Sequence, residues 1–137
     1  LRELFGERFR PVLVPPWNRI AAALEPELAS LGIRALSTFG PRHRQPIVPG
    51  LIRLNAHIDI IDWRGTRGFR GVDGVLADTV AHLRMRRAQH MDATEPTGLL
   101  SHHLDHDEGC WAFVEAFNAR VHAHPAACWI DIDNALG

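Results

Sequence analysis

The sequence predicts an α/β fold with about five parallel strands and helices between them. Two observations support this prediction. Short apolar runs alternate with helical patterns along the chain, and each of three unusual polar clusters directly follows a strand candidate. In α/β barrels and open α/β sheets, ligands bind where the parallel strands end. The pattern therefore places a candidate site at the carboxyl edge of the predicted sheet.

The first half of the chain contains two strand candidates separated by a helix. The apolar run 11–14 ends at a pair of prolines, and the run 33–38 leads into a loop rich in Pro and Gly over 39–50. Between them, 18–31 has a helical pattern that Pro26 interrupts, and the glycine that follows is a suitable stop.

The second half alternates three further strand candidates with two long helices. The strands are expected at 51–57, from 98 to 100, and at 128–130. The helices are expected at about 73–90, with Asp73 as N-cap and Leu76, Val80 and Leu83 on one face, and at about 107–122.

Composition limits the classes of protein that fit. The 137 residues suffice for one domain with a real core, and the net charge of −1 gives no electrostatic case for binding nucleic acid or an anionic membrane. No apolar run is long enough to span a membrane, so we expect a soluble, cytoplasmic protein. Cys110 and Cys128 lie in apolar patterns and are predicted to be buried free thiols. The chain does not begin with methionine, and we expect it to be part of a longer protein.

The cluster PPWNR follows the first strand candidate. Trp17 offers a flat ring that stacks on sugars or fills a core, and Arg19 offers a fixed cation. Taken alone, this cluster favours a loop that merely packs its prolines and tryptophan.

The stretch HIDIIDW ends the third strand candidate. If the strand continues to Asp59, then His57 and Asp59 project to the same face, and Asp62 lies in the turn beyond, beside Trp63. A carboxylate next to an indole is suited to orienting a histidine and stabilising its protonated form. Alternatively, Asp59 caps a turn and Asp62 pairs with an arginine of the loop that follows, which carries Arg64, Arg67 and Arg70.

The third cluster, SHHLDHD, follows the fourth strand candidate. His102 and His106 are four residues apart and would share a helical face as metal ligands, but a strand ends here. His102 at a strand tip is either a general acid or base, or a structural hydrogen-bonding group. Asp107 is the predicted N-cap of the last long helix.

Taken in order, VPPWNR, DIIDW and LLSH resemble the later motifs of the polysaccharide deacetylase-like family, of the NodB-homology type within the glycoside hydrolase/deacetylase superfamily. The resemblance implies that residues 1–137 are the C-terminal portion of one distorted (β/α) barrel domain, with the N-terminal portion absent. It also implies a metal-dependent hydrolase that removes acetyl groups from a polysaccharide or another acylated sugar.

The resemblance also implies roles for individual residues. His102 would be the general acid and Asp62 the carboxylate that tunes it. Residues that would bind substrate are Trp17, Arg19, Asp59, Trp63, which would wall the acyl pocket, and Leu100, which would line it. Val14 stands where the family has an arginine, and Arg19 is a candidate to compensate for it.

The first two family motifs, which supply the base and the ligands for zinc or another divalent metal, have no counterpart here. The expected partners are a carbohydrate substrate and either the missing half of the barrel or a neighbouring chain that covers the exposed sheet edge. No nucleic-acid or membrane partner is expected. The alternative function is a catalytically impaired carbohydrate-binding domain, which Val14 favours.

Overall fold

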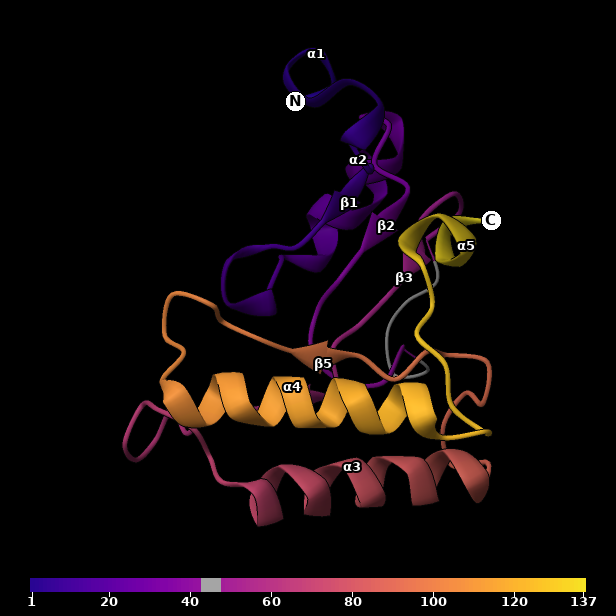
Figure 1. Ribbon diagram of the computed structural model, residues 1–137. Coiled ribbons are helices and arrows are strands. Elements are labelled where there is room, and N and C mark those ends of the chain that lie inside the picture. The colour runs from indigo at the N-terminus through magenta and orange to yellow at the C-terminus, as the bar shows by residue number, and fades with distance from the viewer. Residues whose placement is uncertain (43–47) are drawn as a thin grey trace. The chain divides into compact units, whose positions relative to one another are not determined.

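The computed structural model describes residues 1–42 and 48–137, and its elements are drawn in Figure 1. The fold is mixed α/β with parallel strands in two small sheets, and no closed barrel is found among the residues described. By their contacts the residues form two compact units. The first unit comprises Leu1–Asn55 with Ile130–Gly137, and the second comprises Ala56–Trp129.

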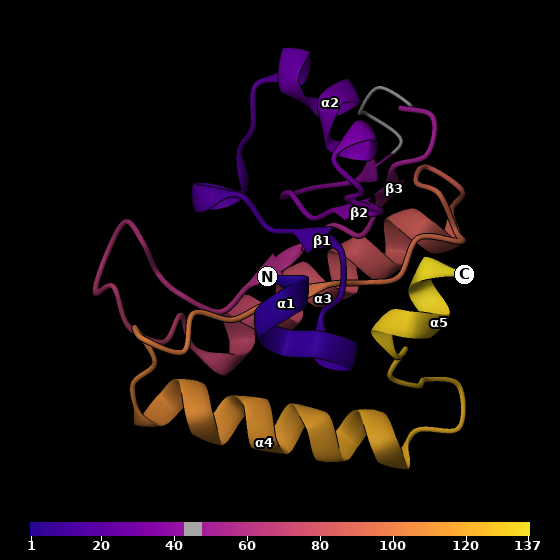
Figure 2. The same cartoon turned by 90° about the horizontal axis from the view of Figure 1, so that it is seen from above.

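The first unit is built on a three-stranded parallel sheet in the order β1-β2-β3 (Figure 2). The strands are β1 (Val12–Leu13), β2 (Ala35–Leu36) and β3 (Ile52–Arg53). The α-helices are α1 (Arg2–Phe5), α2 (Glu25–Ser30) and α5 (Ile132–Leu136), and 3-10 turns lie at Gly6–Arg8, Pro16–Asn18 and Ala22–Leu24. The apolar core consists of Leu28 of α2, Leu36 of β2 and Leu51.

Pro26 helps to start a helix in this unit. The sequence predicted a helix over 18–31 that Pro26 interrupts, but α2 is short and has this proline in its first turn. Proline is tolerated there because its missing N–H would have no helical partner anyway. The segment before α2 forms 3-10 turns, so the predicted helix was too long at its amino end.

The interior of the first unit also holds polar side chains. Arg53 forms an ion pair with Glu25, and both side chains are 8% exposed. The Asn55 side chain accepts hydrogen bonds from the backbone N–H and the hydroxyl of Thr38 and donates one to the carbonyl of Gly40. These bonds tie the segment after β2 to the segment after β3.

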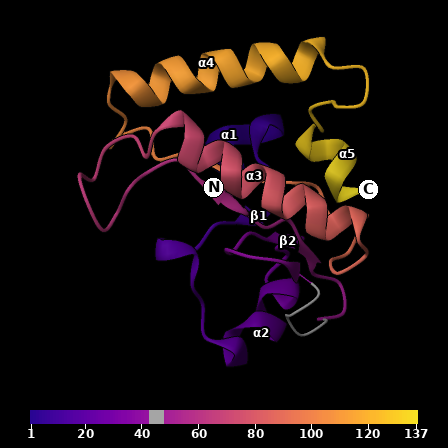
Figure 3. The same ribbon diagram turned by 90° about the horizontal axis from the view of Figure 1, so that it is seen from below.

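The second unit contains two parallel strands, each followed by a long helix. The strands are β4 (Ile58–Asp59) and β5 (Leu99–Leu100), and the helices are α3 (Val72–Arg87) and α4 (Glu108–Ala123). Ile58 lies opposite Leu99, and Asp59 lies opposite Leu100. The helices α3 and α4 run in the same direction, as expected when each follows a parallel strand (Figures 1 and 3).

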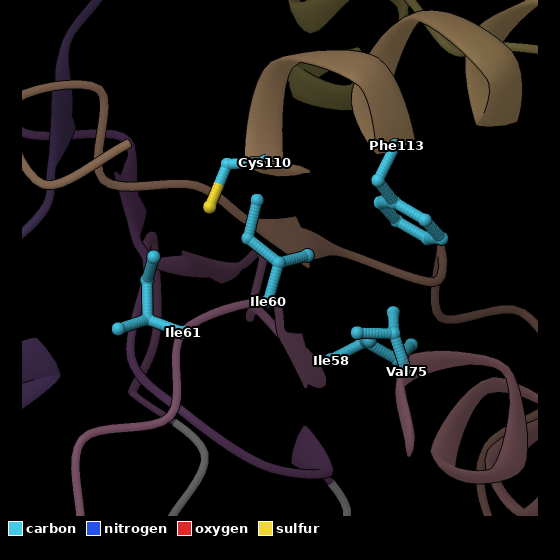
Figure 4. Packing of buried hydrophobic residues seen from close by; sticks show 6 residues of the cluster. All are labelled: Ile58, Ile60, Ile61, Val75, Cys110 and Phe113. Atoms are coloured by element: carbon cyan, nitrogen blue, oxygen red, sulfur yellow. The ribbon is translucent and has the colours of Figure 1, made fainter. Parts of the chain in front are cut away.

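The three isoleucines of HIDIIDW form the core of the second unit. Ile58, Ile60 and Ile61 are at most 3% exposed. They pack with Val75 of α3 and with Cys110 and Phe113 of α4 (Figure 4). The segment HIDIIDW therefore contains three isoleucines because their side chains pack it against the helices α3 and α4.

Truncating one of these isoleucines should have a moderate cost. Ile60 is fully buried, so we expect Ile60→Val to lower the free energy of unfolding by about 1 kcal/mol, through lost transfer energy and a small cavity. Urea denaturation would measure this change. Leu104→Val, at a side chain 90% exposed, is the control and should leave stability unchanged.

Several predicted elements differ from those observed. The run 51–57 does not form one strand, because β3 and β4 lie at 52–53 and 58–59 and belong to different sheets. The predicted strand 128–130 is wrong: these residues are exposed and irregular, and no described strand pairs with them. Cys128 is accordingly exposed, whereas Cys110 is buried, and both thiols are free.

The long helices agree better with the sequence. Asp107 is confirmed as the N-cap of α4, since its carboxylate accepts a hydrogen bond from the backbone of Cys110. Helix α3 begins one residue before the expected cap, so Gly71 is its N-cap and Asp73 lies in its first turn. None of the helices described is long and apolar enough to cross a membrane.

Candidate functional site

Asp59 ends β4, and its carboxylate is held by two donors. Its Oδ1 accepts a hydrogen bond from the backbone N–H of Ile61 at 3.0 Å, and its Oδ2 accepts one from Nε1 of Trp63 at 2.8 Å. The Ile61 N–H can reach the carboxylate because the chain bends directly after β4. The bond from Trp63 holds the indole next to the end of this strand. The carboxylate therefore has a fixed position at the carboxyl edge of the second sheet.

His102 reaches the same place from β5. Its Nε2 is 3.6 Å from Oδ2 of Asp59, and its ring lies edge-on to Trp63, with 4.7 Å between ring centroids and 87° between planes. Leu100, which is half-buried, pairs in register with Asp59. The structure thus brings together four of the residues expected in the site, namely Asp59, Trp63, Leu100 and His102.

The turn after β5 fixes the backbone of His102. Its carbonyl accepts a hydrogen bond from Asp105, and its N–H donates one to Nε2 of His106 at 3.2 Å. The His106 ring in turn packs edge-on against Trp111, with 4.4 Å between centroids. His102 and His106 are therefore joined through the backbone, and His106 has a structural explanation.

Asp62, which the resemblance implies tunes His102, is hydrogen-bonded within the turn that follows it. Its carboxylate accepts hydrogen bonds from the backbone amides of Gly65 and Thr66, at 3.0 and 3.4 Å. A Cβ added at Gly65 would lie 2.1 Å from Oδ2 of Asp62, so this close approach requires glycine. The carboxylate next to His102 is that of Asp59. The Asp62 carboxylate is instead bonded to backbone amides of its own turn.

The arginines of the loop 64–70 do not pair with Asp62 in the residues described. Arg70 forms an ion pair with Asp78 of α3 at 2.7 Å. The Arg67 guanidinium lies 5.9 Å from the Trp63 ring centre, and Arg67 has a positive φ of 59°. The predicted alternative of an Asp62–arginine pair is thus replaced by a turn in which backbone N–H groups satisfy the carboxylate.

His57 points into a different cluster at the opposite end of the sheet. Its Nδ1 accepts a hydrogen bond from the N–H of Gly98, its ring centroid is 4.3 Å from that of His82, and its Nε2 is 3.3 Å from Glu95. Burial, aided by the positive charge of Arg86, lowers the pKa of His57 to about 4.

The same surroundings keep His82 neutral. Burial lowers its pKa to about 4, with smaller contributions from His57 and Arg86, while Glu95 acts in the opposite direction. The sequence did not reveal this cluster. One signal was available, since His82 shares a face of α3 with the buried residues Val75 and Thr79.

Trp17 and Arg19 belong to the first unit, and both are exposed. Trp17 is 91% exposed, with a positive φ of 53°. Val14, where the resemblance implies an arginine, is 59% exposed. The convergence of these residues with His102 stays a prediction.

A divalent metal would need more ligands than the cluster of Asp59, Trp63 and His102 offers. In the part of the chain described, no group of three or more His, Cys, Asp and Glu side chains is arranged to hold a metal ion. Asp59 and His102 are two groups of ligand type, but their third neighbour is the Trp63 indole, which does not coordinate metals. This cluster therefore does not fit the metal that the resemblance implies.

Comparisons with known proteins do not assign the chain to a family. It matches no protein-family model, and searches of curated proteins and of solved structures gave no match. The site and fold define an α/β protein with an Asp–Trp–His cluster where two parallel strands end.

Proposed function

We propose that this chain carries the proton-donating half of a site that removes acetyl groups from an acylated sugar, within a distorted (β/α) barrel of polysaccharide deacetylase type. The observation that carries the proposal is the convergence of Asp59, Trp63 and His102 at the carboxyl ends of β4 and β5. Ligands of α/β proteins bind at this edge.

His102 is the proposed general acid, and Asp59 takes the role that the resemblance implies for Asp62. Since Nε2 of His102 faces Asp59, Nδ1 is the ring nitrogen left for a substrate. The Asp59 carboxylate lies 3.6 Å from Nε2 and helps to hold the orientation of the ring. Water adds to the acetyl carbonyl carbon, and the carbon–nitrogen or carbon–oxygen bond to the sugar then breaks. Nδ1–H delivers its proton to the departing sugar nitrogen or oxygen, and the acetyl group leaves as acetate.

Trp63 and Leu100 are the proposed walls around the acetyl group. Trp63 is 41% exposed while its Nε1–H is bonded to Asp59, so the ring keeps a fixed direction and an accessible surface. Trp17 and Arg19 remain proposed substrate-binding residues. The steps proposed here use only these side chains, and the zinc or other divalent metal that the resemblance implies would need ligands outside this cluster.

A binding experiment tests the proposal on the 137-residue chain. Chitin oligomers and the corresponding deacetylated oligomers would be titrated while tryptophan fluorescence is followed. We expect the affinity for the acetylated form to be higher by about tenfold or more, because only that form has acetyl groups to pack against Trp63 and Leu100. Trp63→Ala should remove the preference, whereas Trp129→Ala, at a tryptophan 47% exposed and outside the cluster, should keep it. Equal binding of the two sugars would contradict the proposal.

A kinetic experiment tests the catalytic role of His102 in the natural protein that contains these 137 residues. With zinc or cobalt present, we expect His102→Ala to reduce acetate release by about 10²- to 10⁴-fold, the usual contribution of a general acid. His103→Ala changes the neighbouring exposed histidine and should leave the rate unchanged. Wild-type turnover by His102→Ala would remove the assigned acid.

The second candidate function is sugar binding without turnover. Val14 in place of the family arginine and the exposed ring of Trp17 favour it. In that case the acetyl preference would persist, and the natural protein would release no acetate above the metal-only control.

A further inference from the structure

Helix α3 packs with one face and leaves a second, apolar face exposed. Its buried positions are Val75, Thr79 and His82. The exposed face, called here the α3 stripe, consists of Val72, Leu76, Val80 and Leu83, which are 50%, 41%, 43% and 45% exposed. The sequence had placed three of these residues on one face, and the structure shows that this face is not the buried one.

The spacing of the α3 stripe makes it a continuous strip of apolar surface. Its residues follow each other at intervals of four, four and three, which keeps them on one side of an α-helix. The strip runs over twelve residues, and its eleven steps at 1.5 Å per residue give a length of about 16 Å. A contiguous exposed apolar strip of this kind marks an interaction surface more often than chance.

Nothing within the second unit covers the α3 stripe. In an alternating β/α arrangement each helix packs against helical neighbours, but α4 is the only other helix in this unit. In Figure 3 the ribbon of α3 is seen unobstructed, with α4 beside it.

The charges of α3 identify an occupant. Asp73 lies in the first turn, and Arg84 and Arg87 lie in the last. On a helical wheel Asp73 and Arg84 lie next to each other along one border of the α3 stripe. Arg87 lies in line with the stripe itself, beyond its carboxyl end. A second α3 running antiparallel would set Asp73 of each copy beside Arg84 and Arg87 of the other, while the apolar residues meet between them.

We propose that the α3 stripe is the contact surface of a homodimer in which two copies of α3 pack antiparallel about a two-fold axis near Val80. Such an interface is self-complementary, because each copy supplies one acidic and one basic end. A single helix pair is small for an interface, so the dimer forms reversibly and depends on concentration. The surface lies outside the Asp59–His102 cluster, and its assignment is independent of the proposed function.

Sedimentation equilibrium of the 137-residue chain over a range of concentrations tests the dimer. We expect a reversible monomer–dimer equilibrium in the wild type. Leu76→Glu should abolish association, whereas Leu31→Glu, at a side chain 76% exposed in the first unit, should not. Because both changed residues are exposed, circular dichroism should show that both variants remain folded. A wild-type chain that stays monomeric, or a dimer that Leu76→Glu leaves intact, would overturn the proposal.

Charge reversal tests the antiparallel arrangement itself. Asp73→Arg alone, and Arg84→Asp with Arg87→Asp, should each weaken the dimer by about tenfold or more. All three changes in one chain should restore association, since the pairs reform with opposite polarity. If the combined variant failed to recover association, antiparallel self-pairing would be excluded. The same result would be obtained if another segment or a different protein covered the α3 stripe.

Discussion

Replacing Arg53 with methionine is expected to lower the free energy of unfolding of the first unit by about 3 to 5 kcal/mol. Arg53 and Glu25 form an ion pair in which both side chains are 8% exposed. Removing the guanidinium leaves the Glu25 carboxylate in the interior without that partner, and the cost of burying its charge is then uncompensated. The loss would be measured by urea denaturation and by hydrogen exchange of the Ala35 and Ser37 amides, which bond to the segment of β1.

Two variants separate this effect from simple loss of packing. Arg53→Met combined with Glu25→Met removes both charges, and we expect it to recover most of the lost stability, because no isolated charge remains. Arg10→Met breaks the ion pair between Arg10 and Asp133. Because these side chains are 36% and 56% exposed, the change should alter stability little. If Arg53→Met were as stable as the wild type, the pair would not be a determinant of this unit.

Acid should destabilise the second unit before most carboxylates titrate. Burial holds the pKa of His57 and of His82 at about 4, below their ordinary value of 6.5. Between pH 6.5 and pH 4 the unfolded chain therefore binds protons that the folded chain does not. Stability is fully present above about pH 6.5, falls as the pH drops toward 4, and stops changing through these groups below that value. Each histidine contributes on the order of 2 kcal/mol to this loss.

The two effects should be less than additive, because the rings of His57 and His82 lie 4.3 Å apart. A proton on one ring disfavours a proton on the other, while Glu95 partly offsets the charge of His82. Urea denaturation at several pH values between 4 and 7 would give the slope of stability against pH. That slope reports how many more protons the unfolded state binds than the folded state.

His82→Leu provides the matched test. Nε2 of His82 is buried without a hydrogen-bond partner among the described residues, so a leucine of similar volume leaves no donor or acceptor unsatisfied. We expect this variant to lose about one linked proton from the slope and to be more stable than the wild type near pH 5. His103→Leu, at an exposed histidine, should retain the full slope. An unchanged slope in His82→Leu would show that this cluster does not cause acid sensitivity.

The two histidine clusters lie at opposite ends of the second sheet, and we expect them to have different roles. His57 and His82 lie where β4 and β5 begin, buried and neutral, and we expect them to affect stability. His102 lies beyond the end of β5, next to Asp59 and an accessible tryptophan ring. This arrangement matches the general division in α/β folds, where the carboxyl edge of the sheet carries chemistry and the amino edge supports the structure.

Local signals were reliable where a short segment decides its own structure. Asp107 as a helix cap, the strand at Leu99–Leu100 and the two long helices follow from nearby residues, and the structure confirms them. The strand predicted at 128–130 failed because strand formation needs a partner strand, and its apolar residues carry no information about whether one is within reach.

The sequence by itself determined that polar clusters follow apolar strands, and that His102 and an aspartate of DIIDW are the chemically notable groups. Only the tertiary structure decided which aspartate meets the histidine. Backbone amides of the next turn capture Asp62, while the register of β4 against β5 sets Asp59 opposite Leu100 and so beside His102. The same applies to α3, because helical spacing groups its apolar residues but does not say which face the strand contacts. Pairing between distant segments has no local energetic signature, and for that reason it could not be predicted from the residues alone.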